Sequence, residues 1–318
     1  MANQGIKNKI FAISPYIEIF TRKIYWNYPN LFSKFNVNNK SARLPSQLKD
    51  FNKILKYLED ESIGDGSLMV LHSSFEDLES TGLSPKRVID ILLNFLGENG
   101  TLAVNSARKF KEEKSGEYLT QDLSNVVTEY DTKKTRVWTG AIPMYLLRHS
   151  QAEISQFPIN PMVAVGKLAK EMMKNNLQGD LKSCGVGSSW EFCVKNNAVI
   201  VGIGIDLTHS LTIMHVAEDT NEEWPIKNWY RNRRFSITHN GERNEITILE
   251  RKPNWGTLHF AERTLCKDLI DNGILKVKNI DGVQIEYLYA NKLINFLNSK
   301  SEKGYPYFGI NKKHKNEN

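Results

Sequence analysis

Two short apolar segments decide the fold: Ser-Leu-Met-Val-Leu-His at residues 67–72 and Thr-Leu-Ala-Val at residues 101–104. Each has the length and composition of a buried strand. Between them, Ser84-Pro85 is typical of a helix start, with a capping serine and a proline at the first helical position. Two strands joined through a crossover helix naturally pair in parallel. The sequence therefore predicts an α/β fold.

A third apolar run, at residues 198–205, also indicates a buried strand. Beyond it, Thr212, His215 and Glu218 occur three residues apart, so a helix or tight turn would place them on one face. A strand end that delivers a histidine and a glutamate side by side is a common way to build a general base with an orienting carboxylate. We interpret His215 as the candidate base and Glu218 as its partner. From spacing alone, a buried core histidine stays open as the alternative.

Three further segments are assigned from similar patterns. Residues 105–135 are polar and indicate a long functional loop. Residues 163–176 indicate a helix. Asn240-Gly241 is a turn sequence and predicts a β-hairpin.

We divide the chain into a basic and aromatic arm at residues 1–45, a single α/β domain at 46–305 and a disordered tail at 306–318. One interpretation of the arm is an amphipathic segment that packs on the core or on a second subunit of a homodimer. The other is a basic and aromatic helix at a membrane surface, which would make a peripheral membrane contact. We favour the packing arm because no long 3.6-residue period is present.

Composition narrows the class of protein. The 318 residues carry a net charge of +6 with a pI near 9.0, which favours anionic partners and disfavours a polycationic substrate. No apolar run is long enough for a transmembrane helix, and we expect no secretory signal. Cys184, Cys193 and Cys266 form no C-x-x-C pair and no disulfide framework, which predicts a reducing, cytoplasmic location. We expect no metal, because no set of His, Cys or Asp has ligand spacing.

A basic cluster with aromatic neighbours occupies residues 227–234. Its cations are Lys227, Arg231, Arg233 and Arg234. Cations beside aromatic rings suit phosphates and a stacked base. The alternative is a solvated surface turn. Nucleic-acid binding also fits the composition, but no nucleic-acid motif accompanies the cluster, so we expect no nucleic-acid partner.

A set of motifs runs through the chain in a fixed order. They are His72-Ser73-Ser74, Gly97, Gly100-Thr101-Leu102, Tyr130-Asp131-Thr132, Gly140, Arg148, Gly166, Gly187-Ser188 and Thr212-x-x-His215-x-Ala217-Glu218. In this order and spacing, the sequence resembles the antibiotic N-acetyltransferase family, whose best-known members are the aminoglycoside 3-N-acetyltransferases. The resemblance covers about residues 50–300.

The resemblance implies a three-layer α/β/α sandwich with a mixed central sheet. It also implies an acetyl-CoA-dependent N-acetyltransferase in which an amine attacks the thioester directly. His215 would be the general base, supported by Glu218. The loop at His72, Ser73 and Ser74 would hold the pantetheine arm and thioester. We assign Ser106 and Thr212 to the same donor, and Arg148 and Asp131 to the acceptor.

The sequence departs from the family pattern at positions that concern the acceptor. Met144 stands where the family often has glutamate, and Leu211 where it usually has asparagine. Loss of acidic and polar groups there, together with the basic pI, argues against a polyamine antibiotic. We therefore favour an amino sugar linked to a nucleotide, used in surface-glycan synthesis, with the 227–234 cluster on its diphosphate. The alternatives are an aminoglycoside acceptor and, in a different class, a non-catalytic module that binds polyanions.

Overall fold

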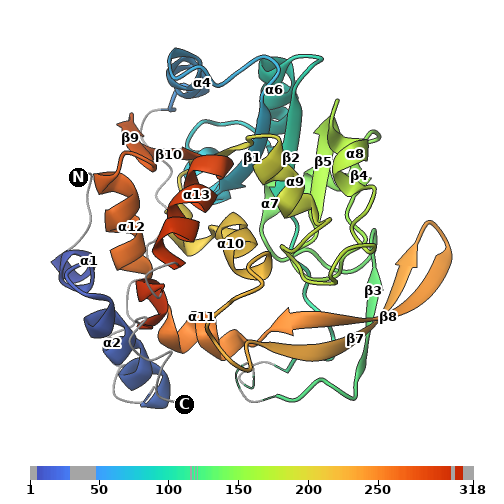
Figure 1. Ribbon diagram of the computed structural model, residues 1–318. Coiled ribbons are helices and arrows are strands. Elements are labelled where there is room, and N and C mark those ends of the chain that lie inside the picture. The colour runs from blue at the N-terminus through green and yellow to red at the C-terminus, as the bar shows by residue number, and fades with distance from the viewer. Residues whose placement is uncertain are drawn as a thin grey trace.

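A computed structural model describes residues 6–28, 48–114, 117, 119, 121–301 and 305–310. Its centre is a seven-stranded sheet in the order β4-β5-β2-β1-β6-β10-β9 (Figure 1). The strands are β1 (Leu68–Ser73), β2 (Thr101–Asn105), β4 (Glu153–Ile154), β5 (Met162–Gly166), β6 (Val199–Ile203), β9 (Lys276–Ile280) and β10 (Val283–Tyr289). β1 pairs in parallel with both β2 and β6, and the remaining pairs are antiparallel. The predicted parallel unit and the mixed sheet are confirmed.

Helices cover both faces of this sheet, because its strands are apolar on both sides. Met69 and Leu71 of β1 face one core, whereas Leu68 and Val70 face the other. The first core is completed by α4 (Phe51–Asp60), α5 (Phe75–Glu79), α6 (Pro85–Leu96) and α7 (Ala141–Leu146). The second is completed by α8 (Ala169–Met173), α9 (Ser189–Lys195), α10 (Val216–Asp219), α12 (Glu262–Asp271) and α13 (Ala290–Ser301). The fold is therefore the expected three-layer α/β/α sandwich.

A second, three-stranded sheet lies beside the sandwich; its hairpin was predicted, whereas its third strand was not. It consists of β3 (Val127–Asp131), β7 (Tyr230–His239) and β8 (Glu242–Arg251), with β3 parallel to β7. β7 and β8 form the long hairpin in Figure 1. Its turn is the predicted Asn240-Gly241, whose residues have φ of 49° and 91°, as such a two-residue turn requires.

Two segment predictions are corrected by the structure. The polar stretch 105–135 contains β3 and is not a loop throughout, since Thr128 and Tyr130 alternate inward and are buried. The helix predicted at 163–176 is strand β5 followed by the short α8. A short run that is apolar on both faces has no period that separates a buried strand from a buried helix.

The N-terminal segment folds into α1 (Ile6–Phe11) and α2 (Pro15–Asn27). α2 packs against α11 (Pro253–His259), α12 and η4 (Pro306–Phe308). Tyr307 and Phe308 of η4 are buried, so packed structure continues past the boundary predicted at residue 305. The remaining parts of the arm and tail, residues 1–5, 29–47 and 311–318, lie outside the described residues. Within the described part of the chain, no helix combines the length and the apolar character needed to cross a bilayer.

Candidate active site

His215 and Glu218 are brought together by the short helices that follow β6. These are η2 (Leu207–His209), η3 (Thr212–His215) and α10. His215 Nδ1 lies 2.7 Å from Glu218 Oε2. The Glu218 side chain is fully buried, whereas the imidazole of His215 is 26% exposed and lines a cavity. The geometry is that of a base held by a carboxylate behind it.

Arg251, at the end of β8, holds the carboxylate of this pair. Its Nη1 donates to Glu218 Oε2 at 3.0 Å, and its Nε lies 3.9 Å from Asp219 Oδ1. Burial favours the neutral form of Glu218, but His215 and Arg251 outweigh it and lower the pKa of that carboxyl below its ordinary value. An ionised Glu218 can only accept hydrogen bonds, so Nδ1–H of His215 is the donor of this pair. His215 Nε2 is thereby left with a lone pair that can receive a proton.

Asp219, the neighbour of Glu218, connects α10 to β7 and to the segment before α9. It accepts hydrogen bonds from the Tyr230 hydroxyl at 2.8 Å and from the Cys184 backbone N at 3.0 Å. Burial opposes the charge of Arg251, but Asp219 and Glu218 raise the pKa of its guanidinium above the ordinary value. The Arg251 charge is therefore permanent, and the buried carboxylates are compensated.

The cavity in front of His215 has a volume of about 520 Å³, which is the size of a small-molecule site. Its apolar wall is aromatic and comes from segments far apart in sequence. These residues are Trp26, Trp229, Trp255, Phe260 and Phe308. The buried indole Nε1 groups of Trp229 and Trp255 have no hydrogen-bond partner within the described chain. Polar groups in the wall include Ser210, Glu250 and Lys252.

The residues assigned to the donor are only partly brought to this cavity. Thr212 lines it, and its Oγ1 accepts a hydrogen bond from Asn105 Nδ2 at 3.1 Å. His72, Ser73 and Ser74 lie at the carboxyl end of β1 and do not line it. Burial lowers the pKa of His72 to about 4, and its Nε2 is unpartnered, so this imidazole is neutral.

Ser106 is fully buried outside the cavity, and its hydroxyl donates to the Pro161 carbonyl at 3.0 Å. The assigned acceptor residues Arg148 and Asp131 also lie outside the cavity lining. Asp131 Oδ1 accepts from the backbone N of Lys133 and Lys134, so it caps the turn after β3. The roles of His72, Ser73, Ser74, Ser106, Arg148 and Asp131 in substrate binding stay predictions.

The basic cluster is not the solvated surface turn of the alternative interpretation, since its arginines lie on strand β7. Arg231 pairs with Glu250 at 2.7 Å. Arg233 is 1% exposed and pairs with Glu250 at 2.8 Å and with Glu113 at 2.9 Å.

The other two cations lie at the surface. Arg234 is 3.7 Å from Glu245, and Lys227 is exposed just before β7. None of Lys227, Arg231, Arg233 and Arg234 lines the cavity. Arg231 and Arg233 already have carboxylate partners, which a diphosphate would have to displace.

The sequence analysis missed Arg251, Asp219 and Tyr230. One signal was available: a two-residue turn at Asn240-Gly241 pairs Tyr230 with Arg251 across the hairpin. That register places Arg251 beside Tyr230 but does not say that the pair meets His215, which depends on how the hairpin docks on the sandwich.

Comparison with known proteins identifies the family. Residues 70–301 match the sequence model described as aminoglycoside 3-N-acetyltransferase. The chain belongs to this family. It is accordingly an acetyl-CoA-dependent N-acetyltransferase, with acetyl-CoA as co-substrate. No curated protein matches the sequence.

Solved structures of the family share the fold of this N-acetyltransferase. AAC-IIIb, in a binary complex with CoASH, superimposes with a TM-score of 0.66 at 17% identity, over 81% of this chain and 97% of that one. The aminoglycoside acetyltransferase AAC(3)-Xa gives a TM-score of 0.67 at 18% identity, over 80% and 93%. AAC(3)-IIb gives 0.65 at 19% identity, over 82% and 99%. In this chain, no group of three or more His, Cys, Asp and Glu side chains within the described residues is placed to hold a metal ion.

Proposed function

We propose that this enzyme acetylates an amine of an aminoglycoside-type amino sugar. The observation that carries the proposal is the His215–Glu218–Arg251 arrangement at the wall of an aromatic cavity. The aromatic rings of the wall offer an apolar face, and Ser210, Glu250 and Lys252 offer polar groups, which together suit a ring that carries hydroxyl groups. The family match supports the aminoglycoside class of acceptor.

His215 has a defined part in the proposed reaction. The nitrogen of the amine attacks the carbonyl carbon of the acetyl thioester, and the C–N bond forms as the C–S bond breaks. His215 Nε2 takes the proton from the nitrogen and returns it to the departing sulfur, which gives the amide and the thiol. Glu218 stabilises the imidazolium between these two transfers, and Arg251 keeps Glu218 ionised.

The nucleotide-linked acceptor loses the support it had from the sequence. The cluster assigned to its diphosphate lies outside the cavity, and three of its four cations, Arg231, Arg233 and Arg234, are paired with glutamates. Met144 lies on α7, which packs on the opposite core, so the missing glutamate there does not concern this cavity. Leu211 does line it. The match to an enzyme family argues against the alternative of a non-catalytic module that binds polyanions.

A thiol-release assay with acetyl-CoA tests the acceptor class. Kanamycin-type aminoglycosides and nucleotide-linked amino sugars are assayed in parallel, with His215→Ala as the control for catalysis. We expect release with aminoglycosides only. Release with nucleotide-linked sugars only would overturn the acceptor class while leaving the chemistry at His215 intact. The cytoplasmic location, the homodimer and the membrane contact of the arm stay predictions.

A further inference from the structure

Helix α2 supplies part of the wall of the His215 cavity. Arg22 and Trp26 line the cavity, although α2 lies outside residues 70–301 that match the family. The matched part of the chain contains His215 and Glu218 and therefore the chemistry common to the family. Because α2 lies outside the matched residues, its side chains can contribute to the choice of acceptor, which differs between members of the family.

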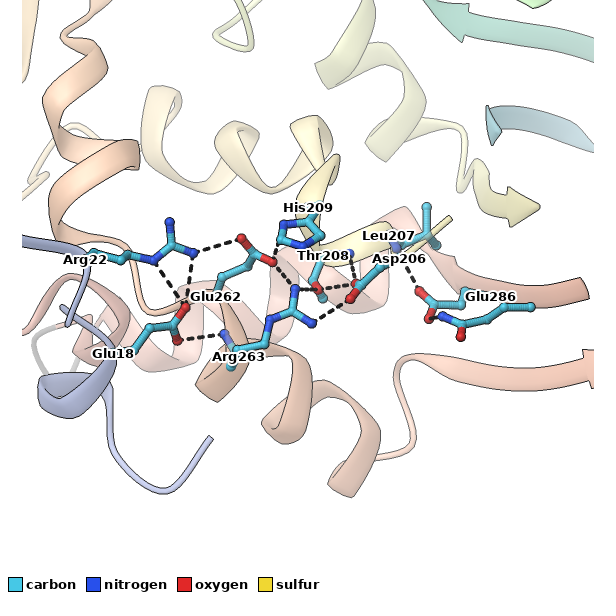
Figure 2. A network of polar contacts seen from close by, with 10 residues as sticks. Glu18, Arg22, Asp206, Leu207, Thr208, His209, Glu262, Arg263 and Glu286 are labelled. Carbon is cyan, nitrogen blue, oxygen red and sulfur yellow. Dashed lines mark hydrogen bonds and ion pairs between the residues drawn. The ribbon is translucent and has the colours of Figure 1, made fainter. Parts of the chain in front are cut away.

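Buried ion pairs fix α2 against the sandwich (Figure 2). The buried Glu18 accepts from the backbone N of Arg263 at 2.8 Å and from Arg22 Nη2 at 3.1 Å. The same Nη2 donates to Glu262 Oε2 at 3.0 Å. Because Glu18 and Glu262 are both buried, loss of either partner would leave a charge without compensation. α2 is thus held in one position and is a defined wall.

The contacts continue from α2 to a second histidine at the cavity. His209 Nδ1 lies 2.7 Å from Glu262 Oε1, and His209 lines the cavity. Arg22 and Arg263 both contact Glu262, so it is a carboxylate and Nδ1–H of His209 donates to it. Partial loss of solvent around the ring and the nearby Arg263 lower the pKa of His209. The neutral ring keeps Nε2 as a hydrogen-bond acceptor.

The cation that α2 brings to the cavity already has carboxylate partners. Arg22 pairs with Glu18 at 3.1 Å and with Glu262 at 3.0 Å, so a phosphate of CoA would have to displace these partners to bind it. The ring of Trp26 is 46% exposed and offers an apolar face beside it.

We infer that α2 builds an acceptor subsite in which Trp26 receives a sugar ring remote from the acetylated amine and His209 accepts a hydrogen bond from it. This inference rests on the proposed function. It concerns binding of the acceptor and not the transfer step. The subsite is used only by acceptors with more than one ring.

Steady-state kinetics of Trp26→Ala test the subsite, with Phe20→Ala as the matched control. Phe20 lies on the same helix, is 66% exposed and does not line the cavity. Each variant is assayed with a three-ring aminoglycoside and with its single-ring aminocyclitol core. We expect Trp26→Ala to raise KM for the three-ring acceptor by about tenfold. KM for acetyl-CoA and for the single-ring acceptor, and both kcat values, are expected to stay unchanged, and Phe20→Ala to change nothing.

Two outcomes would overturn the subsite. If Trp26→Ala raises KM for acetyl-CoA, α2 contacts the donor and not the acceptor. If Trp26→Ala and the wild type have the same KM for every substrate, α2 has a structural role only. If the wild-type enzyme turns over no aminoglycoside, the proposed function fails on its own. Calorimetry of the three-ring aminoglycoside with the wild type and Trp26→Ala then decides the subsite, since absent or equal binding rejects it and weaker binding by Trp26→Ala supports it.

Discussion

Two histidine–glutamate pairs lie at the same cavity, and they differ in how they are built. His215 and Glu218 are three residues apart on consecutive short helices, whereas His209 on η2 meets Glu262 on α12. In both pairs Nδ1 lies 2.7 Å from a carboxylate oxygen, and arginine contacts that carboxylate. The His209 imidazole is 63% exposed, more than twice the exposure of His215.

A carboxylate that orients the imidazole is therefore not sufficient to make a histidine a general base. His215 stands over a fully buried glutamate, where less water screens the interaction and the imidazolium is stabilised most strongly. His209 is open to solvent, so the same tautomer serves binding. Substitutions in and around the two pairs test this division.

Replacing His215 with alanine should abolish most of the activity. Without an acceptor for the amine proton, we expect kcat to fall by about 10²–10⁴-fold. Calorimetry should show unchanged binding of acetyl-CoA, because the imidazole acts on the amine. His239→Ala, on the hairpin outside the cavity, is the control and should retain full activity. Equal turnover by both variants would remove His215 from the mechanism.

Replacing Arg251 with methionine should destabilise the fold. Asp219 and Glu218 would remain buried without their cation, at a cost of about 3–5 kcal/mol in the free energy of unfolding. Urea unfolding measures the loss. Arg234→Met on the neighbouring strand removes an exposed arginine and should cost about 0–1 kcal/mol. A similar loss in the two variants would show that Arg251 does not hold the buried carboxylates.

The two networks should respond to pH with opposite sign. Glu286 lies at one end of the polar network that includes His209 (Figure 2). Its carboxyl group accepts a hydrogen bond from Leu207 N at 2.8 Å, and burial raises its pKa from 4.5 to about 7. The native state then binds this proton more tightly than the unfolded chain. Its contribution to stability is present below pH 4.5 and is lost as pH rises to about 7, by at most about 3 kcal/mol. Glu218, with a lowered pKa, contributes above its unfolded pKa and loses that contribution as pH falls.

Urea unfolding of Glu286→Gln at pH 5 and pH 8 isolates the first of these effects. The variant should gain stability relative to the wild type at pH 8 but not at pH 5. Glu245→Gln, an exposed glutamate on β8, should give equal differences at both values. A constant difference for Glu286→Gln would show that its carboxyl does not titrate near neutrality.

Replacing His209 with asparagine should have the smallest effect. The asparagine side chain can still donate a hydrogen bond to Glu262, but it is shorter than that of histidine and extends less far into the cavity. We expect KM for a three-ring aminoglycoside to rise by no more than about tenfold, with kcat within about twofold. A fall in kcat comparable with that of His215→Ala would make His209 a second base and end the division drawn above.

Much of the fold was predictable from local patterns. The strands at 67–72, 101–104 and 198–205 are apolar runs of strand length, and the turn at Asn240-Gly241 has the residues that its positive φ values require. The helix predicted at 163–176 overlaps strand β5 (Met162–Gly166), because a short segment buried on both faces carries no period.

The α/β layers, the His215–Glu218 pair and the family were predictable from the sequence, because each depends on neighbours within a few residues or on motifs in a fixed order. The folded structure was needed to show that Arg251 compensates Glu218, that Glu262 orients His209, and that Trp26 of α2 reaches the cavity. These contacts join residues far apart in the chain. The buried carboxylates of Glu218 and Glu262 each require a partner, and only packing determines which residues are buried together.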